Sequence, residues 1–143
     1  MTETTADLTT IEQTVDIDAP PELVWDYWTD PKLLTEWWGI EADVQPAPGG
    51  SYRIVMEGGP VARGEYTEVD RPKRLVFTFG WEGNTPSGPL APGSTRVEVT
   101  LTSHGEGTRL VLRHELPSTH AADHSKGWAF FVGERLPAAI KAR

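Results

Sequence analysis

The sequence predicts an α+β fold in which a curved antiparallel sheet wraps around one long C-terminal helix. About seven segments before residue 118 show the two-residue alternation of half-buried strands, whereas residues 118–143 form the longest stretch without it. The expected order of one strand, two short helices, six strands and a long helix departs from the strand–helix alternation of parallel folds. The apolar face of the last helix must be buried, and the concave side of the sheet is its simplest partner. An incomplete fit between sheet and helix would leave a cavity.

The first strand is expected at residues 11–17, where apolar residues at alternate positions share one face with the polar Gln13. The polar residues before it predict a flexible N-terminus over residues 1–10. Nothing after it resembles a linker, so residues 11–143 are expected to form a single domain.

Two short helices in tandem are predicted over residues 21–29 and 31–38, because apolar residues recur there at helical spacing. Asp30 suits the N-cap of the second helix and Pro31 its first position. Gly39 is well placed to end that helix.

Six more strands are predicted to form a meander after the two helices. Their expected ranges are 40–45, 51–57, 61–69, 75–81, 95–103 and 108–116. Residues 82–94 form a loop of 13 residues rich in Gly and Pro, and such long loops are often functional or mobile. In the last strand, His114 shares the inward face with leucines.

The terminal helix is expected to turn one stripe of side chains toward the sheet. That stripe contains His124, Gly127, Trp128, Phe131 and Arg135, and Val132, Leu136 and Ala139 widen it to a broad face. Pro137 removes the hydrogen bond to the Gly133 carbonyl and should kink the last turns.

Composition excludes several classes of function. The 143 residues include no cysteine, which removes thiol catalysis, disulfides and cysteine-based zinc sites. The net charge of -8 argues against binding to nucleic acid or to anionic membranes. No secretory signal and no membrane-spanning run is present, so a cytoplasmic protein without membrane insertion is expected. Six tryptophans could supply flat walls for a ligand or simply fill the core.

The histidines are the main candidates for chemistry. His120 and His124 lie one helical turn apart, as in zinc sites, but a third ligand is lacking and Ala121 stands where metalloproteases have Glu; no metal is expected. No cofactor motif occurs either. His114 could transfer protons or bind a polar ligand group. The alternative is a buried histidine bonded to a backbone carbonyl.

Short motifs along nearly the whole chain resemble the START-like (SRPBCC, helix-grip) superfamily, in its branch of homologues of the activator of the heat-shock-protein-90 ATPase. They are APPELVW (19–25), TDP (29–31), WWG (37–39), GGSYR (49–53), GEYTEV (64–69), RLVFTF (74–79), TRLVLRH (108–114) and GW (127–128). The resemblance implies a helix-grip fold with an apolar pocket, but no single activity, because the superfamily includes lipid carriers, aromatases, cyclases and hydrolases. The eukaryotic activator has a second domain that this sequence lacks, so stimulation of a chaperone is not expected.

The hypothesis that these observations favour is a non-enzymatic protein that binds an apolar, aromatic or lipid-like molecule between sheet and helix. The expected walls are Trp28, Tyr52, Tyr66, Phe77, Phe79, Trp81, Trp128 and Phe131, with His114 and Arg135 as polar anchors. The alternatives are an aromatase, cyclase or hydrolase that uses His114, and a module that binds a protein partner through its surface. A sheet edge and an exposed Trp25 could also support a homodimer.

Overall fold

The computed structural model describes residues 7–143. Its first half contains β1 (Leu8–Ile17), α1 (Pro21–Thr29), α2 (Pro31–Leu34), β2 (Glu41–Val44), β3 (Ser51–Val55), β4 (Val61–Asp70) and β5 (Arg74–Glu82). Its second half contains β6 (Asn84–Thr85), β7 (Gly88–Pro89), β8 (Thr95–His104), β9 (Gly107–Pro117), the 3-10 turn η1 (Ser118–His120), α3 (Ala121–Phe130), the π-helical segment η2 (Phe131–Arg135) and α4 (Leu136–Ala142).

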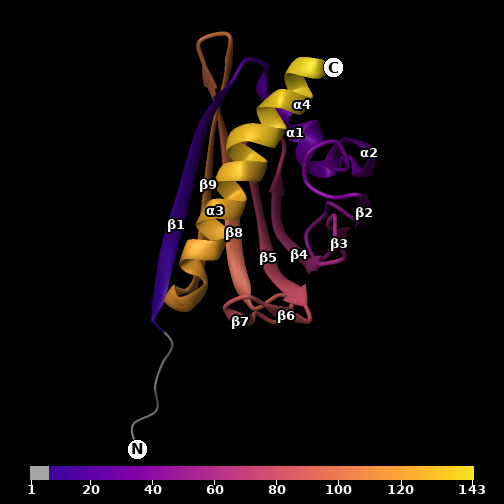
Figure 1. Cartoon of the computed structure of the whole chain (residues 1–143). Coiled ribbons are helices and arrows are strands. Elements are labelled where there is room, and N and C mark those ends of the chain that lie inside the picture. Colours follow the sequence, from indigo (N-terminus) through magenta and orange to yellow (C-terminus); the bar gives the residue numbers. More distant parts are fainter. Residues whose placement is uncertain (1–6) are drawn as a thin grey trace, which may run out of the picture.

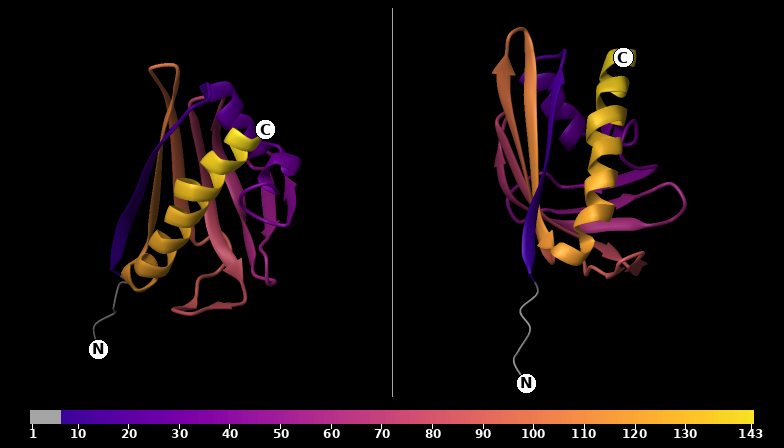
Figure 2. Two further views of the ribbon diagram at one scale, coloured as in Figure 1. Left: turned by 45° about the horizontal axis from the view of Figure 1, so that its top comes forward. Right: turned by 60° about the vertical axis from the view of Figure 1, so that its left-hand side comes forward.

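The main sheet has seven strands in the order β1-β9-β8-β5-β4-β3-β2, and all neighbours are antiparallel. The continuous helix of α3, η2 and α4 lies across its concave face (Figure 1). Figure 2 shows α1 and α2 beside the end of this helix that carries the C-terminus. The predicted α+β architecture, with a sheet that grips the terminal helix, is confirmed.

The N-terminal boundary differs from the prediction. Of the residues expected to be flexible, 1–6 lie outside the described part of the chain, but Leu8–Thr10 already belong to β1 and pair with Glu115–Pro117 of β9. The extension follows from β9, which continues to Pro117 and offers its edge to these residues. Trp25, expected to be exposed, is only 4% exposed and belongs to the core.

The second helix is shorter than its apolar pattern suggested. Asp30 caps it, as its Oδ1 atom accepts a hydrogen bond of 2.8 Å from the Lys32 amide. The α-helix ends at Leu34, and a turn carries the chain through Trp37 and Trp38. The indole of Trp37 donates to the Tyr27 carbonyl at 2.8 Å, which ties this turn to α1.

The segment predicted to be a long loop folds back on itself. Its two short strands, β6 and β7, form a ribbon in which Thr85 Oγ1 donates to the Gly88 carbonyl at 2.6 Å. Gly80 allows the returning chain to approach β5, because a Cβ atom there would lie 1.7 Å from the Ala91 carbonyl oxygen. The ribbon is therefore held at the end of β5 (Figure 1).

The terminal helix contains a π turn instead of a simple proline kink. Pro137 has no amide hydrogen to donate to Gly133, and the preceding amide, that of Leu136, donates to the Phe131 carbonyl five residues back. A π turn takes more residues per turn than an α-helix, so it rotates the side chains that follow it. The buried stripe accordingly recurs at every fourth residue, as His120, His124, Trp128, Val132, Leu136 and Ile140.

Candidate functional site

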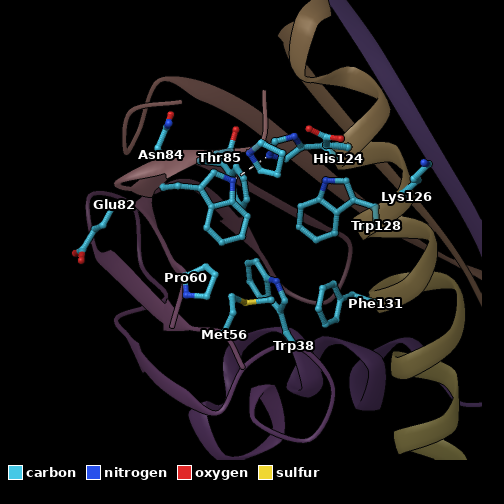
Figure 3. A pocket seen from close by; sticks show the side chains of 15 residues that line it. Trp38, Met56, Pro60, Glu82, Asn84, Thr85, His124, Lys126, Trp128 and Phe131 are labelled. Atoms are coloured by element: carbon cyan, nitrogen blue, oxygen red, sulfur yellow. Dashed lines mark hydrogen bonds between the residues drawn. The ribbon is translucent and has the colours of Figure 1, made fainter. Parts of the chain in front are cut away.

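A cleft of about 460 Å³ opens between the concave face of the sheet and α3 (Figure 3). Several parts of the chain contribute to it: the turn after α2, the turn between β3 and β4, β5, the ribbon, α3 and the start of η2. Its lining consists of Trp38, Met56, Pro60, Phe79, Trp81, Glu82, Asn84, Thr85, Pro86, Asp123, His124, Lys126, Gly127, Trp128 and Phe131.

Five aromatic side chains form most of the apolar wall. Phe79 is central among them, with ring centroids 5.4 Å from Trp81, 5.7 Å from Trp128 and 6.4 Å from Trp38. Trp38 and Trp128 are themselves 5.6 Å apart. Figure 3 shows Trp38, Trp128 and Phe131 around the same open space. Such a wall can bind flat apolar groups by stacking and by edge contacts.

The first of two buried hydrogen-bond chains orients Trp128. Its indole Nε1–H donates to His114 Nδ1 at 3.1 Å, so the His114 proton must reside on Nε2. That Nε2–H donates to Thr95 Oγ1 at 2.8 Å, and the Thr95 hydroxyl donates to the Phe79 carbonyl at 2.7 Å. Every donor in this series of hydrogen bonds has an acceptor, and the polar edge of Trp128 is thereby turned away from the cleft.

The second chain orients Trp81. Its Nε1–H donates to His124 Nε2 at 2.9 Å, so the other nitrogen of that ring, Nδ1, carries the proton and donates to the His120 carbonyl at 2.8 Å. Burial lowers the pKa of His124, and the Trp81 bond itself requires the neutral ring. Two neutral histidines thus accept hydrogen bonds from the indole N–H groups of two tryptophans in the cleft wall.

His114 is buried, as one of the two interpretations of the sequence expected, but its hydrogen-bond partners differ from those expected. It is fully buried, does not line the cleft, and bonds to Thr95 and Trp128 instead of to a backbone carbonyl. Burial, with a smaller contribution from nearby His124, lowers the pKa of His114 to about 3. Because both ring nitrogens are already bonded, His114 has no free lone pair with which to take a proton from a ligand.

The rim of the cleft is polar and partly charged. Glu82 is neutralised by Arg53 and Arg63, at 3.4 and 3.0 Å. The ribbon is joined to α3 by a short hydrogen bond from the Ser87 hydroxyl to the Asp123 carboxylate. The mouth therefore combines hydrogen-bonding groups with an apolar interior.

The structure separates the predicted site residues into three groups. Phe79, Trp81, Trp128 and Phe131 line the cleft. A second group, Trp28, Tyr52, Tyr66 and Phe77, surrounds a small internal void beyond Trp38. Arg135 and His114 line neither space. Arg135 is exposed, with its guanidinium carbon 5.8 Å from the centre of the Phe130 ring, because the π turn places Leu136 and not Arg135 on the inner face.

Several lining residues were not predicted. Trp38 could not be distinguished from its neighbour Trp37 by periodicity, because the short turn that holds both is not regular. Asn84, Thr85 and Pro86 come from the long loop, whose length was the only available signal.

Two kinds of feature are absent from the described part of the chain. No three His, Cys, Asp or Glu side chains of residues 7–143 come together as a metal site would require. Over the same residues, no helix has the length and apolar character needed to cross a membrane.

Comparison with known proteins supports the architecture described above. The model of the family described as Activator of Hsp90 ATPase homolog 1-like protein matches residues 18–141. No curated protein matches the sequence significantly. Among solved structures, protein MLL2253 from Mesorhizobium loti is similar with a TM-score of 0.80 and 27% identity, over 94% of this chain and 98% of that one.

Two further solved structures are similar at comparable identity. DynU16, a protein of the dynemicin biosynthetic locus, has a TM-score of 0.78 and 28% identity; the alignment covers 92% of this chain but only 47% of DynU16. CalU16 from Micromonospora echinospora has a TM-score of 0.70 and 27% identity, over 94% of this chain and 74% of that one.

Proposed function

The chain belongs to the Activator of Hsp90 ATPase homolog 1-like protein family, and on that premise we propose that it binds a small, flat and mostly apolar molecule in the cleft between β5 and α3. The cleft volume of about 460 Å³ falls in the range of about 300–1,000 Å³ that is usual for ligand pockets.

The observation that carries this proposal is the orientation of Trp81 and Trp128. Both indole N–H groups are bonded to buried histidines, at 2.9 and 3.1 Å. The surfaces that these side chains present to the cleft are therefore hydrocarbon, and contact with a ligand there would depend on shape and stacking. Each good aromatic pair contributes about 0.5–1.5 kcal/mol beyond burial of its area. A polar ligand would lose its hydration in this interior without gaining hydrogen bonds in return.

Binding is favoured over acid–base catalysis because the only histidine predicted to act as a proton-transfer group, His114, is behind the wall and has both nitrogens occupied. The similarity to DynU16, which belongs to a biosynthetic locus, fits a role near small-molecule metabolism. The alternative of a module that binds a protein partner through its surface stays a prediction.

Gly127 offers a test that leaves the wall itself unchanged. It lines the cleft from α3, and a Cβ atom there would meet no atom within 4 Å. Gly127→Leu should therefore place a side chain in the cleft without disturbing the core, whereas Gly127→Ala adds only a methyl group and serves as the matched control.

The measurement is a fluorescence titration with 2-(dimethylamino)naphthalene, a flat probe that can quench the tryptophans of the wall. We expect saturable binding to the wild type and to Gly127→Ala, and an affinity at least about tenfold weaker for Gly127→Leu, the loss of roughly 1.4 kcal/mol of contact energy. The proposal is wrong if binding is not saturable, or if Gly127→Leu binds the probe as well as the wild type does.

A further inference from the structure

A small internal void lies on the other side of Trp38 from the cleft, and Trp38 lines both spaces. The void has about 10 Å³ of free volume, close to the minimum for one water molecule. Its lining consists of Trp28, Leu34, Trp38, Tyr52, Ile54, Tyr66, Leu75 and Phe77. Trp38 is the one residue common to the two linings.

One of the residues that line the void, Trp28, has an indole N–H group without an acceptor in residues 7–143. Trp28 is 2% exposed, and its Nε1 atom is buried without a partner among the described residues. The nearest ring is that of Trp37, in edge contact at 4.7 Å between centroids, which supplies no oxygen or nitrogen acceptor. Leaving a buried donor unpaired costs about 1–3 kcal/mol, so an acceptor atom that reached it would recover that energy.

Trp38 differs from three other tryptophans of the core in that no hydrogen bond fixes its indole. Trp37, Trp81 and Trp128 each donate a hydrogen bond through Nε1, at 2.8, 2.9 and 3.1 Å. Among residues 7–143, no hydrogen bond involves the Trp38 indole. The ring is held by packing alone, against Trp28, Trp37, Tyr52, Phe77, Phe79 and Trp128, with ring centroids 5.6–6.4 Å away. It also lies in a turn between α2 and β2, not within a regular element.

We propose that Trp38 is a gate and that the void behind it is the inner end of the ligand site, where Trp28 Nε1–H donates to an acceptor oxygen of the ligand. Rotation of the Trp38 ring would extend the cleft toward Trp28 by the volume that the ring now fills. The ligand is then an elongated flat molecule with an apolar body and a carbonyl-type oxygen at its inner end. This inference rests on the proposed function, because the ligand must first occupy the cleft.

A matched pair of probes tests the inner subsite. Prodan, 6-propionyl-2-(dimethylamino)naphthalene, adds a terminal carbonyl to the body of 2-(dimethylamino)naphthalene. One hydrogen bond contributes about 1 kcal/mol net, which corresponds to an affinity about fivefold higher for prodan. Trp28→Phe keeps an aromatic ring but removes the donor, so it should abolish this preference and leave binding of the carbonyl-free probe unchanged.

Two-dimensional NMR of the wild-type indole N–H groups gives a second readout that does not depend on the folding of a variant. The Trp28 resonance should move downfield with prodan and stay in place with the carbonyl-free probe. In stopped-flow experiments, Trp38→Ala should bind prodan faster than the wild type.

The outcomes separate the two proposals. Equal affinity for both probes, a preference that survives in Trp28→Phe, or a Trp28 resonance that prodan leaves unmoved would overturn the inner subsite while leaving the cleft as a binding site. An unchanged association rate in Trp38→Ala would overturn the gate. Failure of both probes to bind would overturn the proposed function, and the inner subsite with it.

Discussion

Replacement of Thr95 by valine tests whether the buried chain behind Trp128 contributes to stability as its geometry indicates. Thr95 is 8% exposed, and its hydroxyl is the link between His114 Nε2–H, at 2.8 Å, and the Phe79 carbonyl, at 2.7 Å. Valine has nearly the same shape but removes both hydrogen bonds, which leaves a buried donor and a buried acceptor without partners.

Each unpaired buried group costs about 1–3 kcal/mol, and the added apolar methyl offsets about 0.8 kcal/mol. With two such groups, the free energy of unfolding should therefore fall by about 1–5 kcal/mol. For a domain of this size each kcal/mol corresponds to about 3–4 °C in Tm, so circular dichroism should show a decrease of roughly 3–20 °C.

Thr95→Ser is the matched control, because it retains the hydroxyl and loses only a methyl group. It should lose markedly less stability than Thr95→Val, and its Trp128 indole resonance should stay near the wild-type position. If Thr95→Val and Thr95→Ser have the same free energy of unfolding, the hydrogen bonds of Thr95 do not stabilise the fold, and the role of His114 as a buried support for Trp128 is incorrect.

The other predictions concern pH and two glycines. Burial lowers the pKa of His114 to about 3 and also lowers that of His124, so both take up a proton near pH 6.5 only in the unfolded chain. Stability should be constant above about pH 7.5 and decrease as pH falls through 6.5, by about 1.4 kcal/mol per pH unit for His114 alone; urea midpoints that stay equal at pH 7.5 and 4.5 would contradict this. Gly80→Ala should lower the free energy of unfolding by about 1–3 kcal/mol, because its Cβ atom would lie 1.7 Å from the Ala91 oxygen. Gly127→Ala should instead raise the free energy of unfolding by about 0.5–1 kcal/mol, because its Cβ atom would meet no atom within 4 Å. Urea unfolding measures both variants, and a change of the same sign in the two would contradict the prediction.

Most of the fold could be predicted from local pattern. The alternation in residues 75–81 identified β5, and the Asp30 cap with Pro31 located the start of α2. The family resemblance rested on motifs spread along the chain, and the match over residues 18–141 confirms it. The organisation of the chain as a single domain, the cytoplasmic location and the homodimer stay predictions.

The candidate site was predictable only in part. Phe79 and Trp81 follow from strand alternation and Trp128 from helical spacing, and all three line the cleft. Arg135 was placed on the inner stripe by the α-helical period, which the π turn ahead of Pro137 interrupts. Trp38 could not be assigned, because a turn has no period from which the direction of a side chain can be read.

The sequence by itself determined which residues are apolar and at what spacing, and this decides the strands, the helices and the face that each element buries. Only the tertiary structure decided where polar atoms go, because hydrogen-bond partners such as Trp81 and His124 are brought together from distant elements. The same packing turned His114 from a candidate proton carrier into a buried support for Trp128, and left Trp28 with an unpaired donor. The spacing of residues along the chain determines which side chains share a face of one helix or strand. A hydrogen bond between distant residues depends on the distances and angles between several helices and strands.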